Sequence, residues 1–346
     1  MELKTELRGM TKKELSSLME NLEEPNYRGS QIFNWIQAHC EDDLDKMHNL
    51  PKKLKEKMAR QTLIAPLQII REWKGNDGTR KFLLELFDGE KIESVFLKHR
   101  DHNTLCVSSQ VGCSFQCKFC ATGKMGLKRN LLPGEIVGQI HAISKITGCS
   151  IRNVVFMGMG EPLANLEAVV KSIEILGDPE GQNIGQRRIT ISTCGLIPEI
   201  NKLAALEFQC VLAISLHAPN DDLRSKLVPI NRKYPLEELL KACLNYFNAS
   251  GRRISFEYAL IEGINDSPEH AKQLGALLGR FPAHINILPA NPISGGNIKG
   301  SGEEKIKRFV GILEANGLPV SVRKSRGQDI EAACGQLSTL EEEDKE

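Results

Sequence analysis

The 346-residue sequence has no long apolar run and no excess of charge of either sign. A membrane-spanning helix would need an uninterrupted apolar run of about 18 residues, so we expect no membrane span. The amino-terminal stretch MELKTELRGMTKKELSSLMENL is charged and lacks the apolar centre of a secretory signal. This favours a reducing cytoplasm as the compartment. The net charge of +1 neither indicates nor excludes a nucleic-acid partner, because local patches of charge matter more than the total.

The chain also lacks internal repeats and long low-complexity segments, and its composition is that of a folded protein. Hydrophobic residues make up 41% and charged residues 26% of the sequence, which argues against general disorder. The length suffices for one large α/β domain with smaller additions. Ten cysteines in a reducing compartment are better interpreted as ligands, redox groups or buried thiols than as a disulfide framework.

Four segments follow from changes in pattern along the chain. Residues 1–65 are predicted to form a small helical module, with Tyr27, Ile32, Trp35 and Ile36 on one helix face and another helix starting after Pro51. Residues 66–98 carry strand patterns separated by the turn signals NDG and FDGE, which predict an antiparallel ribbon. Residues 99–340 form the main domain, and residues 341–346 are an acidic tail.

Strand and helix patterns alternate through the main domain, which predicts a parallel sheet closed fully or partly into a (β/α) barrel. In barrels of this kind, functional groups collect at the carboxyl ends of the strands. The cysteines from Cys113 onward and the segments 158–162, 192–194 and 215–217 fall at such ends, as does Asn291. We therefore expect the site at this face.

Three cysteines, Cys113, Cys117 and Cys120, lie within eight residues in VGCSFQCKFCATG. Structural zinc usually takes four ligands as two C-x2-C pairs, and a zinc ion here would need a distant fourth ligand. A [4Fe–4S] cluster normally takes four cysteines, so three would leave one iron open to a substrate. Chance clustering on a loop is the remaining interpretation.

The C-x3-C-x2-C spacing, with Phe119 between the second and third cysteines, resembles the radical S-adenosylmethionine (SAM) superfamily. The resemblance implies a partial barrel of the radical SAM type and a [4Fe–4S] cluster on Cys113, Cys117 and Cys120, with SAM on the fourth iron. It leaves the substrate open.

Ordered motifs from residue 93 to residue 337 resemble one family more closely: IESVFL, TLCVSSQVGCSFQCKFCATGKMGLKRNL, VVFMGMGEPLAN, RRITISTCGLIP, AISLHAPNDDLRSKLVPIN, LIEGINDS, INILPANPISG and VRKSRGQDIEAACGQL. This family comprises the radical SAM RNA methyltransferases that modify C2 of adenine in 23S ribosomal RNA, at the peptidyl-transferase centre, and in transfer RNA, at the position 3′ of the anticodon. Adenine C2 is electron-poor and does not attack the SAM methyl group as a nucleophile, so a radical route is needed.

The resemblance implies a role for three further residues. Cys334 would take a methyl group from one SAM and become S-methylcysteine, and cleavage of a second SAM would activate that methyl for addition to C2. Glu93 would accept the C2 proton. Cys106 would then attack the sulfur of Cys334, forming a transient disulfide and releasing the product. By itself, Glu93 would be interpreted as a solvated strand residue.

The family's SAM contacts fall on Gly160 and Glu161, Ser192, the run Ser215, Leu216 and His217, and Asn291. His217 alone would be interpreted as a hydrogen-bonded core histidine. The remaining cysteines are expected to be buried thiols, namely Cys40, Cys149, Cys194, Cys210 and Cys243.

Basic residues near the motifs are candidate RNA phosphate contacts, with a solvated charged face as the alternative: Lys124, Lys128, Arg129, Arg187, Arg188, Arg323, Lys324 and Arg326. The helical module is expected to help bind RNA. A flavodoxin-type electron donor and a monomer are further expectations. Three rivals remain: an enzyme of the antibiotic-resistance branch that methylates adenine C8, a radical SAM activase of another protein, and a non-catalytic zinc- or cluster-bearing RNA-binding module.

Overall fold

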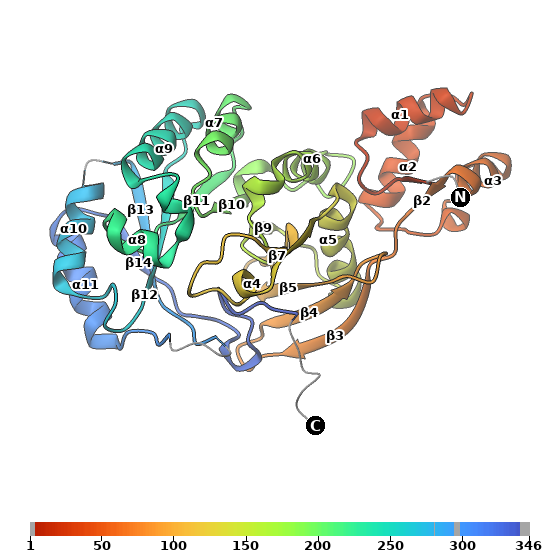
Figure 1. Ribbon diagram of the computed structural model, residues 1–346. Coiled ribbons are helices and arrows are strands. Elements are labelled where there is room, and N and C mark those ends of the chain that lie inside the picture. The colour runs from red at the N-terminus through yellow and green to blue at the C-terminus, as the bar shows by residue number, and fades with distance from the viewer. Residues whose placement is uncertain (1–3, 280, 294–297, 340–346) are drawn as a thin grey trace.

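The computed structural model describes residues 4–279, 281–293 and 298–339. The acidic tail predicted at 341–346 lies outside them. The amino-terminal module contains two short parallel strands, three α-helices and one 3-10 helix (Figure 1). In chain order they are β1 (Thr5–Glu6), α1 (Lys12–Asn21), α2 (Tyr27–Gln37), η1 (Leu44–Lys46), α3 (Lys52–Gln61) and β2 (Thr62–Leu63).

Local sequence explains where these helices begin and which face they bury. Thr11 and Glu14 form a reciprocal capping box at the start of α1, and α3 begins directly after Pro51, as predicted. In α2, Ile32 and Ile36 are fully buried, whereas Tyr27 is 56% exposed. The prediction that Tyr27 shares one helix face with Ile32 and Ile36 was therefore wrong, because Ile36 lies nine residues further along α2, about half a turn around the helix axis from Tyr27.

Three antiparallel strands follow: β3 (Gln68–Lys74), β4 (Arg80–Glu85) and β5 (Lys91–Lys98). Gly78 and Gly89 have φ angles of 80° and 83° at the two turns, a conformation that favours glycine. This confirms the turns predicted from NDG and FDGE. Strand β5 pairs with the first strand of the main domain, so the ribbon continues the main sheet.

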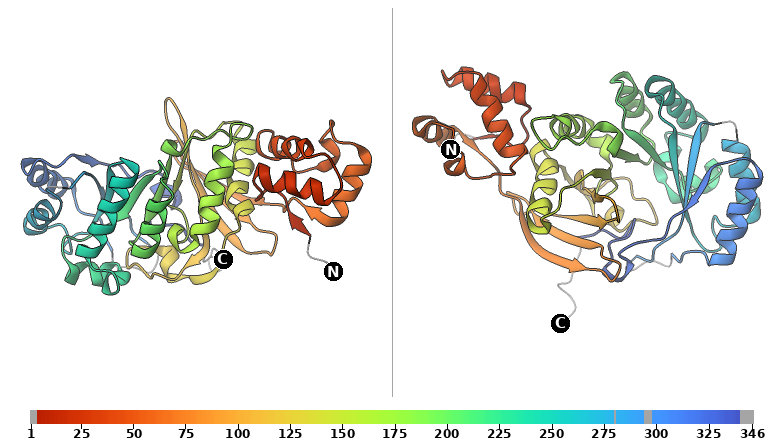
Figure 2. Two further views of the ribbon diagram at one scale, coloured as in Figure 1. Left: turned by 90° about the horizontal axis from the view of Figure 1, so that it is seen from above. Right: turned by 180° about the vertical axis from the view of Figure 1, so that it is seen from behind.

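Within the described residues, ten strands form one mixed sheet in the order β14-β13-β12-β11-β10-β9-β6-β5-β4-β3. From β6 to β14 all neighbours are parallel. These strands are β6 (Asn103–Cys106), β9 (Asn153–Phe156), β10 (Ile189–Thr193), β11 (Val211–Ser215), β12 (Ile254–Leu260), β13 (Ala283–Pro289) and β14 (Val320–Val322). The sheet is curved, as Figure 2 shows, and the expected α/β fold is confirmed.

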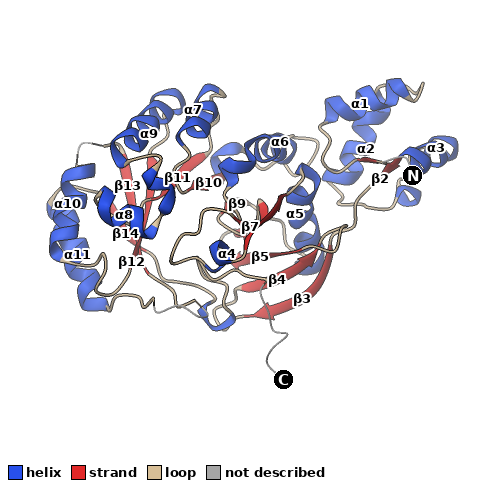
Figure 3. Ribbon diagram, viewed as in Figure 1, coloured by secondary structure: helices blue, strands red, loops and turns tan. Residues whose placement is uncertain are grey.

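Helices cover the outer face of the curved sheet (Figure 3). They are α5 (Pro133–Thr147), α6 (Leu166–Gly177), α7 (Ile197–Ala205), α9 (Leu236–Ser250), α10 (Pro268–Leu278) and α11 (Glu303–Ala315). Helix α8 (Asp221–Leu227) lies inside the arc that these helices form (Figure 3). Short 3-10 helices join them: η2 (Pro162–Asn165), η3 (Gln186–Arg188), η4 (Pro229–Arg232) and η5 (Gln328–Ile330). Every residue of β12 is buried, as expected for a strand covered on both faces. No helix in the described part of the chain is long and apolar enough to cross a membrane.

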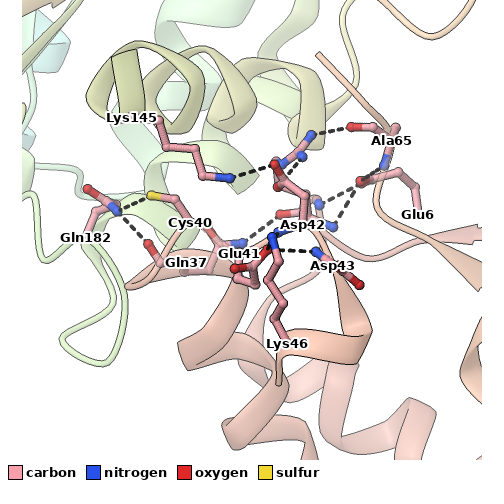
Figure 4. Close-up of polar contacts among 12 residues, drawn as sticks. Glu6, Gln37, Cys40, Glu41, Asp42, Asp43, Lys46, Ala65, Lys145 and Gln182 are labelled. Atoms are coloured by element: carbon pink, nitrogen blue, oxygen red, sulfur yellow. Dashed lines mark hydrogen bonds and ion pairs between the residues drawn. The ribbon is translucent and has the colours of Figure 1, made fainter. Parts of the chain in front are cut away.

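Polar contacts join the amino-terminal module to the barrel (Figure 4). Asp42 accepts a hydrogen bond from Arg8 at 2.8 Å within the module and forms an ion pair with Lys145 of α5 at 2.9 Å. Gln182, which follows α6, donates to the carbonyl of Gln37. One apolar core also runs through both parts, from Leu7 to Leu337. The module is therefore packed against the barrel, and it adjoins α5 and α6.

Candidate functional site

A small hairpin presents the three clustered cysteines. Strand β7 (Gln110–Cys113) ends at Cys113, Cys117 lies in the following loop, and Cys120 precedes the short helix α4 (Ala121–Lys124). Strand β8 (Gly126–Asn130) returns antiparallel to β7. A Cβ atom on Gly112 would lie 1.8 Å from the carbonyl oxygen of Gly126, and its φ is 76°, so only glycine fits there. Sequence analysis missed this hairpin, although Gly112 directly precedes the cysteines and Gly126 follows them.

Contacts from distant segments hold the cysteine loop. The amide of Lys118 donates to the carbonyl of Leu227 in α8 at 3.0 Å. The amide of Ala121 donates to the carbonyl of Gly335 at 2.7 Å, and the hydroxyl of Thr122 donates to the carbonyl of Leu337 at 2.6 Å. The loop is thus fastened to the carboxy-terminal segment that carries Cys334.

The three thiols suit a shared iron–sulfur cluster by donor chemistry and proximity. Burial, with a smaller contribution from a charge on Cys120, raises the pKa of Cys113 to about 12. Burial also raises the pKa of Cys117, and charges on Cys120 and Cys113 contribute to this increase. Burial raises the pKa of Cys120 as well. Thiols in such surroundings become thiolates only beside a cation, and metal binding deprotonates them. Across residues 4–279, 281–293 and 298–339, no three His, Cys, Asp or Glu side chains are arranged as a site for a single metal ion.

The Cys334 loop is held by side chains from the end of β13 and from its own segment. Asn291 donates to the carbonyl of Cys334 at 3.0 Å and accepts a hydrogen bond from Gln328 at 2.7 Å. Gly335 has a φ of 84°, and a Cβ atom there would lie 2.7 Å from the carbonyl of Phe119. The glycine after Cys334 therefore permits the close approach of this loop to the cysteine loop.

The structure brings together the two cysteines that are far apart in sequence. Cys106 ends β6, where it lies opposite Val95 of β5, and a charge on Cys334 raises the pKa of the Cys106 thiol, after the larger effect of burial. Both cysteines are free thiols, with Cys106 half-buried and Cys334 exposed. The two thiols therefore lie within electrostatic reach of each other in the fold, although 228 positions separate them in the sequence.

Glu93 lies on β5, on the same face of the sheet as Val95 because side chains alternate along a strand. The residue is only 2% exposed, which contradicts its interpretation as a solvated strand residue. Its Oε1 is 2.9 Å from the Nζ of Lys81, and its Oε2 accepts a hydrogen bond from the amide of Ser338 at 2.9 Å. Burial raises the pKa of Glu93, while Lys81 and the Ser338 amide lower it.

Gly160 and Glu161 lie in the loop after β9, and Ser192 lies in β10. Gly160 has a φ of 98° and approaches Gln110 so closely that a Cβ would lie 2.5 Å from that side chain. Glu161 is buried, and its carboxylate accepts hydrogen bonds from the amides of Leu163 and Cys194 at 3.0 and 2.8 Å. Burial raises the pKa of Glu161. Its side chain thus joins the loops after β9 and β10.

Ser215 ends β11, and Leu216 and His217 follow it. The amide of Leu216 donates to the carbonyl of Glu257 at 3.0 Å. His217 is buried and has a φ of 57°. Its Nδ1 accepts a hydrogen bond from the amide of Ala259 at 3.0 Å. Burial lowers the pKa of His217 to about 3. Its ring also lies 4.4 Å, centroid to centroid, from that of Phe119. His217 is therefore a neutral, hydrogen-bonded histidine that supports the cysteine loop.

Arg224 of α8 is a buried residue near the site that sequence analysis missed. It is fully buried and donates to the carbonyls of Cys194, Ser215 and Leu216 at 2.7, 3.0 and 3.1 Å and to Asn231 at 2.8 Å. It thereby fixes the ends of β10 and β11 against each other. The resembling stretch AISLHAPNDDLRSKLVPIN contains it, but no sequence signal distinguishes it from a solvated helix arginine.

Comparison with known proteins places this geometry in a family. Residues 107–274 match the family model of the radical SAM superfamily, and residues 5–64 match that of the ribosomal RNA large subunit methyltransferase N-terminal domain. A protein of Moorella thermoacetica, named probable dual-specificity RNA methyltransferase RlmN, is 47% identical over 97% of this chain and 98% of its own length. A protein of the same name from Lachnospira eligens is 43% identical over 98% and 97%. The chain belongs to the dual-specificity RNA methyltransferase family.

A solved structure agrees with this assignment. The crystal structure of a radical SAM methyltransferase from Sphaerobacter thermophilus is 47% identical in sequence and superposes with a TM-score of 0.92. The match covers 96% of this chain and 99% of that one. Over the 96% of the chain that is matched, which includes most of the amino-terminal module, the protein therefore has the architecture of a radical SAM methyltransferase.

In this RNA methyltransferase, some candidate phosphate contacts are engaged within the protein. Arg129 forms two hydrogen bonds of 2.8 Å with Glu135 and an ion pair of 2.7 Å with Asp88. Arg326 donates to the carbonyls of Lys98 and Asp77, both at 2.9 Å. Two exposed candidates also form ion pairs, Lys128 with Glu90 at 2.8 Å and Arg323 with Glu257 at 4.0 Å. The other exposed candidates are Lys124, Arg187, Arg188 and Lys324.

The other cysteines of the methyltransferase follow the prediction with one exception. Cys40, Cys194, Cys210 and Cys243 are buried. Cys149 is half-buried, because it follows the left-handed Gly148 that ends α5 at the surface. Its assignment as a buried thiol was wrong.

Proposed function

We propose that this protein methylates C2 of adenine in 23S ribosomal RNA, at the peptidyl-transferase centre, and in transfer RNA, at the nucleotide 3′ of the anticodon. The relatives' name, dual-specificity RNA methyltransferase, supports an RNA substrate. The observation that carries the proposal is the convergence of Cys106 and Cys334, from opposite ends of the main domain, beside a buried carboxylate and a three-cysteine loop.

Cys113, Cys117 and Cys120 would hold a [4Fe–4S] cluster whose fourth iron is open to SAM. When bound, the cluster and SAM supply the one-electron chemistry that an electron-poor carbon such as adenine C2 requires. The loops at the carboxyl ends of the strands would hold SAM through backbone groups and small polar side chains: Gly160, Glu161, Ser192, Ser215, Leu216, His217 and Asn291.

Three side chains would handle the methyl group and the proton. Cys334 would accept a methyl group from one SAM, and a second SAM would be consumed to activate it, so that two SAM molecules would be used per turnover. The activated carbon on Cys334 would bond to C2, Glu93 would take the C2 proton, and the unpaired electron left on the ring would pass to a one-electron acceptor, a role that the bound cluster would supply. The thiolate of Cys106 would then attack the sulfur of Cys334, forming the S–S bond and breaking the S–C bond, and the released carbon would keep the bonding pair and take a proton to become the methyl group on C2.

External reductant must restore both thiols before the next turnover, and a flavodoxin-type donor would supply electrons. The target adenine must leave its stack to reach Cys334. The proposal assigns the activity to a monomer in the cytoplasm, where both RNA substrates are found.

Product mapping tests the proposal. The anaerobically reconstituted enzyme is given reductant, methyl-labelled SAM and unmodified ribosomal or transfer RNA, and the methylated atom is located by mass spectrometry. Label at adenine C2 is expected in both RNAs. Label at C8 would instead assign the chain to the resistance branch, and SAM cleavage without RNA methylation would refute an RNA substrate.

Two cysteine variants separate the proposed steps. Cys106→Ala is expected to accumulate a covalent protein–RNA adduct, visible as a shifted band on a denaturing gel, because Cys334 cannot be released. Normal turnover by this variant would refute the resolving role. Cys334→Ala is expected to abolish RNA methylation without loss of iron, and Cys210→Ala, at a buried thiol on another part of the barrel, serves as the matched control.

A further inference from the structure

The buried Glu93 has a cationic neighbour, and strand register determines its position. In the β4–β5 pair, Leu83 lies opposite Glu93 and Lys81 lies opposite Val95. Lys81 and Leu83 share a face because they are two residues apart, which makes Lys81 the diagonal neighbour of Glu93 across the strand pair. In the next pair, Val95 lies opposite Cys106. Lys81, Glu93 and Cys106 therefore belong to one face of three adjacent strands.

Lys81 is held in place on its other sides. Its Nζ lies 4.6 Å from the centroid of the ring of Trp73, the residue of β3 that lies opposite Lys81. The same nitrogen donates to the carbonyl of Glu331 at 3.4 Å. Only 6% of Lys81 is exposed. The Trp73 ring and the carbonyl of Glu331, in the segment that precedes Cys334, therefore hold its ammonium group beside Glu93.

Groups of both signs face Glu93 from the elements packed against it. Lys81 approaches from β4, and Glu331 approaches from the carboxy-terminal segment with a charge of the opposite sign. The thioether sulfur of Met159, in the loop after β9, accepts a hydrogen bond from the backbone amide of Glu93 at 3.2 Å. The amide of Ser338 donates a hydrogen bond to Oε2 of Glu93. Burial and Glu331 favour the neutral acid, whereas Lys81 and the Ser338 amide favour the carboxylate.

We propose that Lys81 is a positioning residue for the proton-transfer step, keeping the buried Glu93 ionised and its carboxylate oriented while Cys334 delivers its carbon to the adenine. This inference rests on the proposed function, in which Glu93 is the base. In the step, the C2–H bond breaks, its electron pair stays on the ring, and the proton joins the carboxylate of Glu93. A Glu93 that is already protonated cannot accept this proton. Removal of Lys81 therefore stops proton transfer but leaves the cleavage of SAM unchanged.

The test compares Lys81→Met, Lys81→Arg and Glu93→Gln in the reconstituted holoenzyme. Methylated RNA and 5′-deoxyadenosine are measured separately in single-turnover reactions across a range of pH. In Lys81→Met, 5′-deoxyadenosine is expected at the wild-type rate, whereas RNA methylation at neutral pH falls at least about tenfold and recovers about tenfold per pH unit as Glu93 ionises. Lys81→Arg keeps the cation and is expected to restore a profile close to that of the wild type.

A second measurement does not depend on activity. Infrared difference spectra at neutral pH are expected to show the carbonyl band of a protonated carboxylic acid in Lys81→Met that is absent from the wild type and from the double variant Lys81→Met/Glu93→Gln. The absence of this band, or a methylation profile of Lys81→Met that superposes on that of the wild type, would overturn the inference. A pH-independent loss of both products would overturn it too, because it would show a purely structural role.

The outcomes also separate this inference from the proposed function. If the wild type places no methyl group on C2, the proposed function fails. If the wild type methylates C2 and Glu93→Gln is as active, the base assignment fails and Lys81 has no role through it. If Glu93→Gln is inactive and Lys81→Met is normal, only the inference about Lys81 fails.

Discussion

Replacement of Thr122 by valine is expected to loosen the Cys334 loop from the cysteine loop. The Thr122 hydroxyl, which is buried, donates to the carbonyl of Leu337 at 2.6 Å. Valine preserves the shape of the side chain but leaves that carbonyl without a donor. An unsatisfied buried carbonyl costs about 1–3 kcal/mol, so the ratio of docked to undocked loop should fall about 5- to 150-fold.

Hydrogen exchange of two backbone amides reports this change. The amide of Ala121 donates to Gly335, and the amide of Ser338 donates to Glu93, so both are protected only while the Cys334 loop is docked. Both should exchange faster in Thr122→Val by the factor given above, at unchanged iron content. Thr122→Ser retains the hydroxyl and should exchange like the wild type. Unchanged exchange at both amides in Thr122→Val would refute the assignment of Thr122 as a fastener of the loop.

Two further predictions concern buried charge. Arg224→Met leaves three carbonyls without their donor and should destabilise the fold by at least about 3 kcal/mol, lowering the calorimetric melting temperature by several degrees, whereas the exposed Arg232→Met should not. Burial lowers the pKa of His141 to about 3 from its usual 6.5. The unfolded state therefore binds a proton that the folded state does not, and this residue alone should reduce the free energy of unfolding by about 1.4 kcal/mol for each pH unit below 6.5. In urea titrations at pH 7, 6 and 5, the free energy of unfolding of His141→Leu should depend less steeply on pH than that of the wild type. A pH dependence equal to that of the wild type, or the same reduction in the exposed His48→Gln, would contradict this account.

Much of the fold was predictable because its signals are local. The turns at Gly78 and Gly89 and the start of α3 after Pro51 follow from the backbone preferences of one or two residues. Alternating strand and helix patterns indicated the barrel, because each pattern reports which faces of an element are covered. Two local predictions failed for different reasons. Tyr27 lies about half a turn around α2 from Ile36, so the two cannot share a face. Cys149 follows the glycine that ends α5 at the surface and is therefore only half-buried.

The candidate site divides in the same way. The spacing of Cys113, Cys117 and Cys120 is a local motif, and its resemblance to the radical SAM superfamily indicates iron–sulfur chemistry. The partners that support the site are not local. Lys81 reaches Glu93 only through the register of β4 and β5, and Arg224 reaches the ends of β10 and β11 only because α8 packs beneath them.

The sequence by itself determined the alternation of strands and helices, the three-cysteine motif and the order of the family motifs, because each depends on residues close together in the chain. Tertiary structure alone decided that Glu93 is buried beside a cation, that Cys106 lies within electrostatic reach of Cys334 and that the Cys334 loop is fastened to α4. These contacts join residues that are 12 to more than 200 positions apart. Burial and electrostatic effects at a residue are set by all atoms around it in space, and the residue's neighbours along the chain supply few of those atoms.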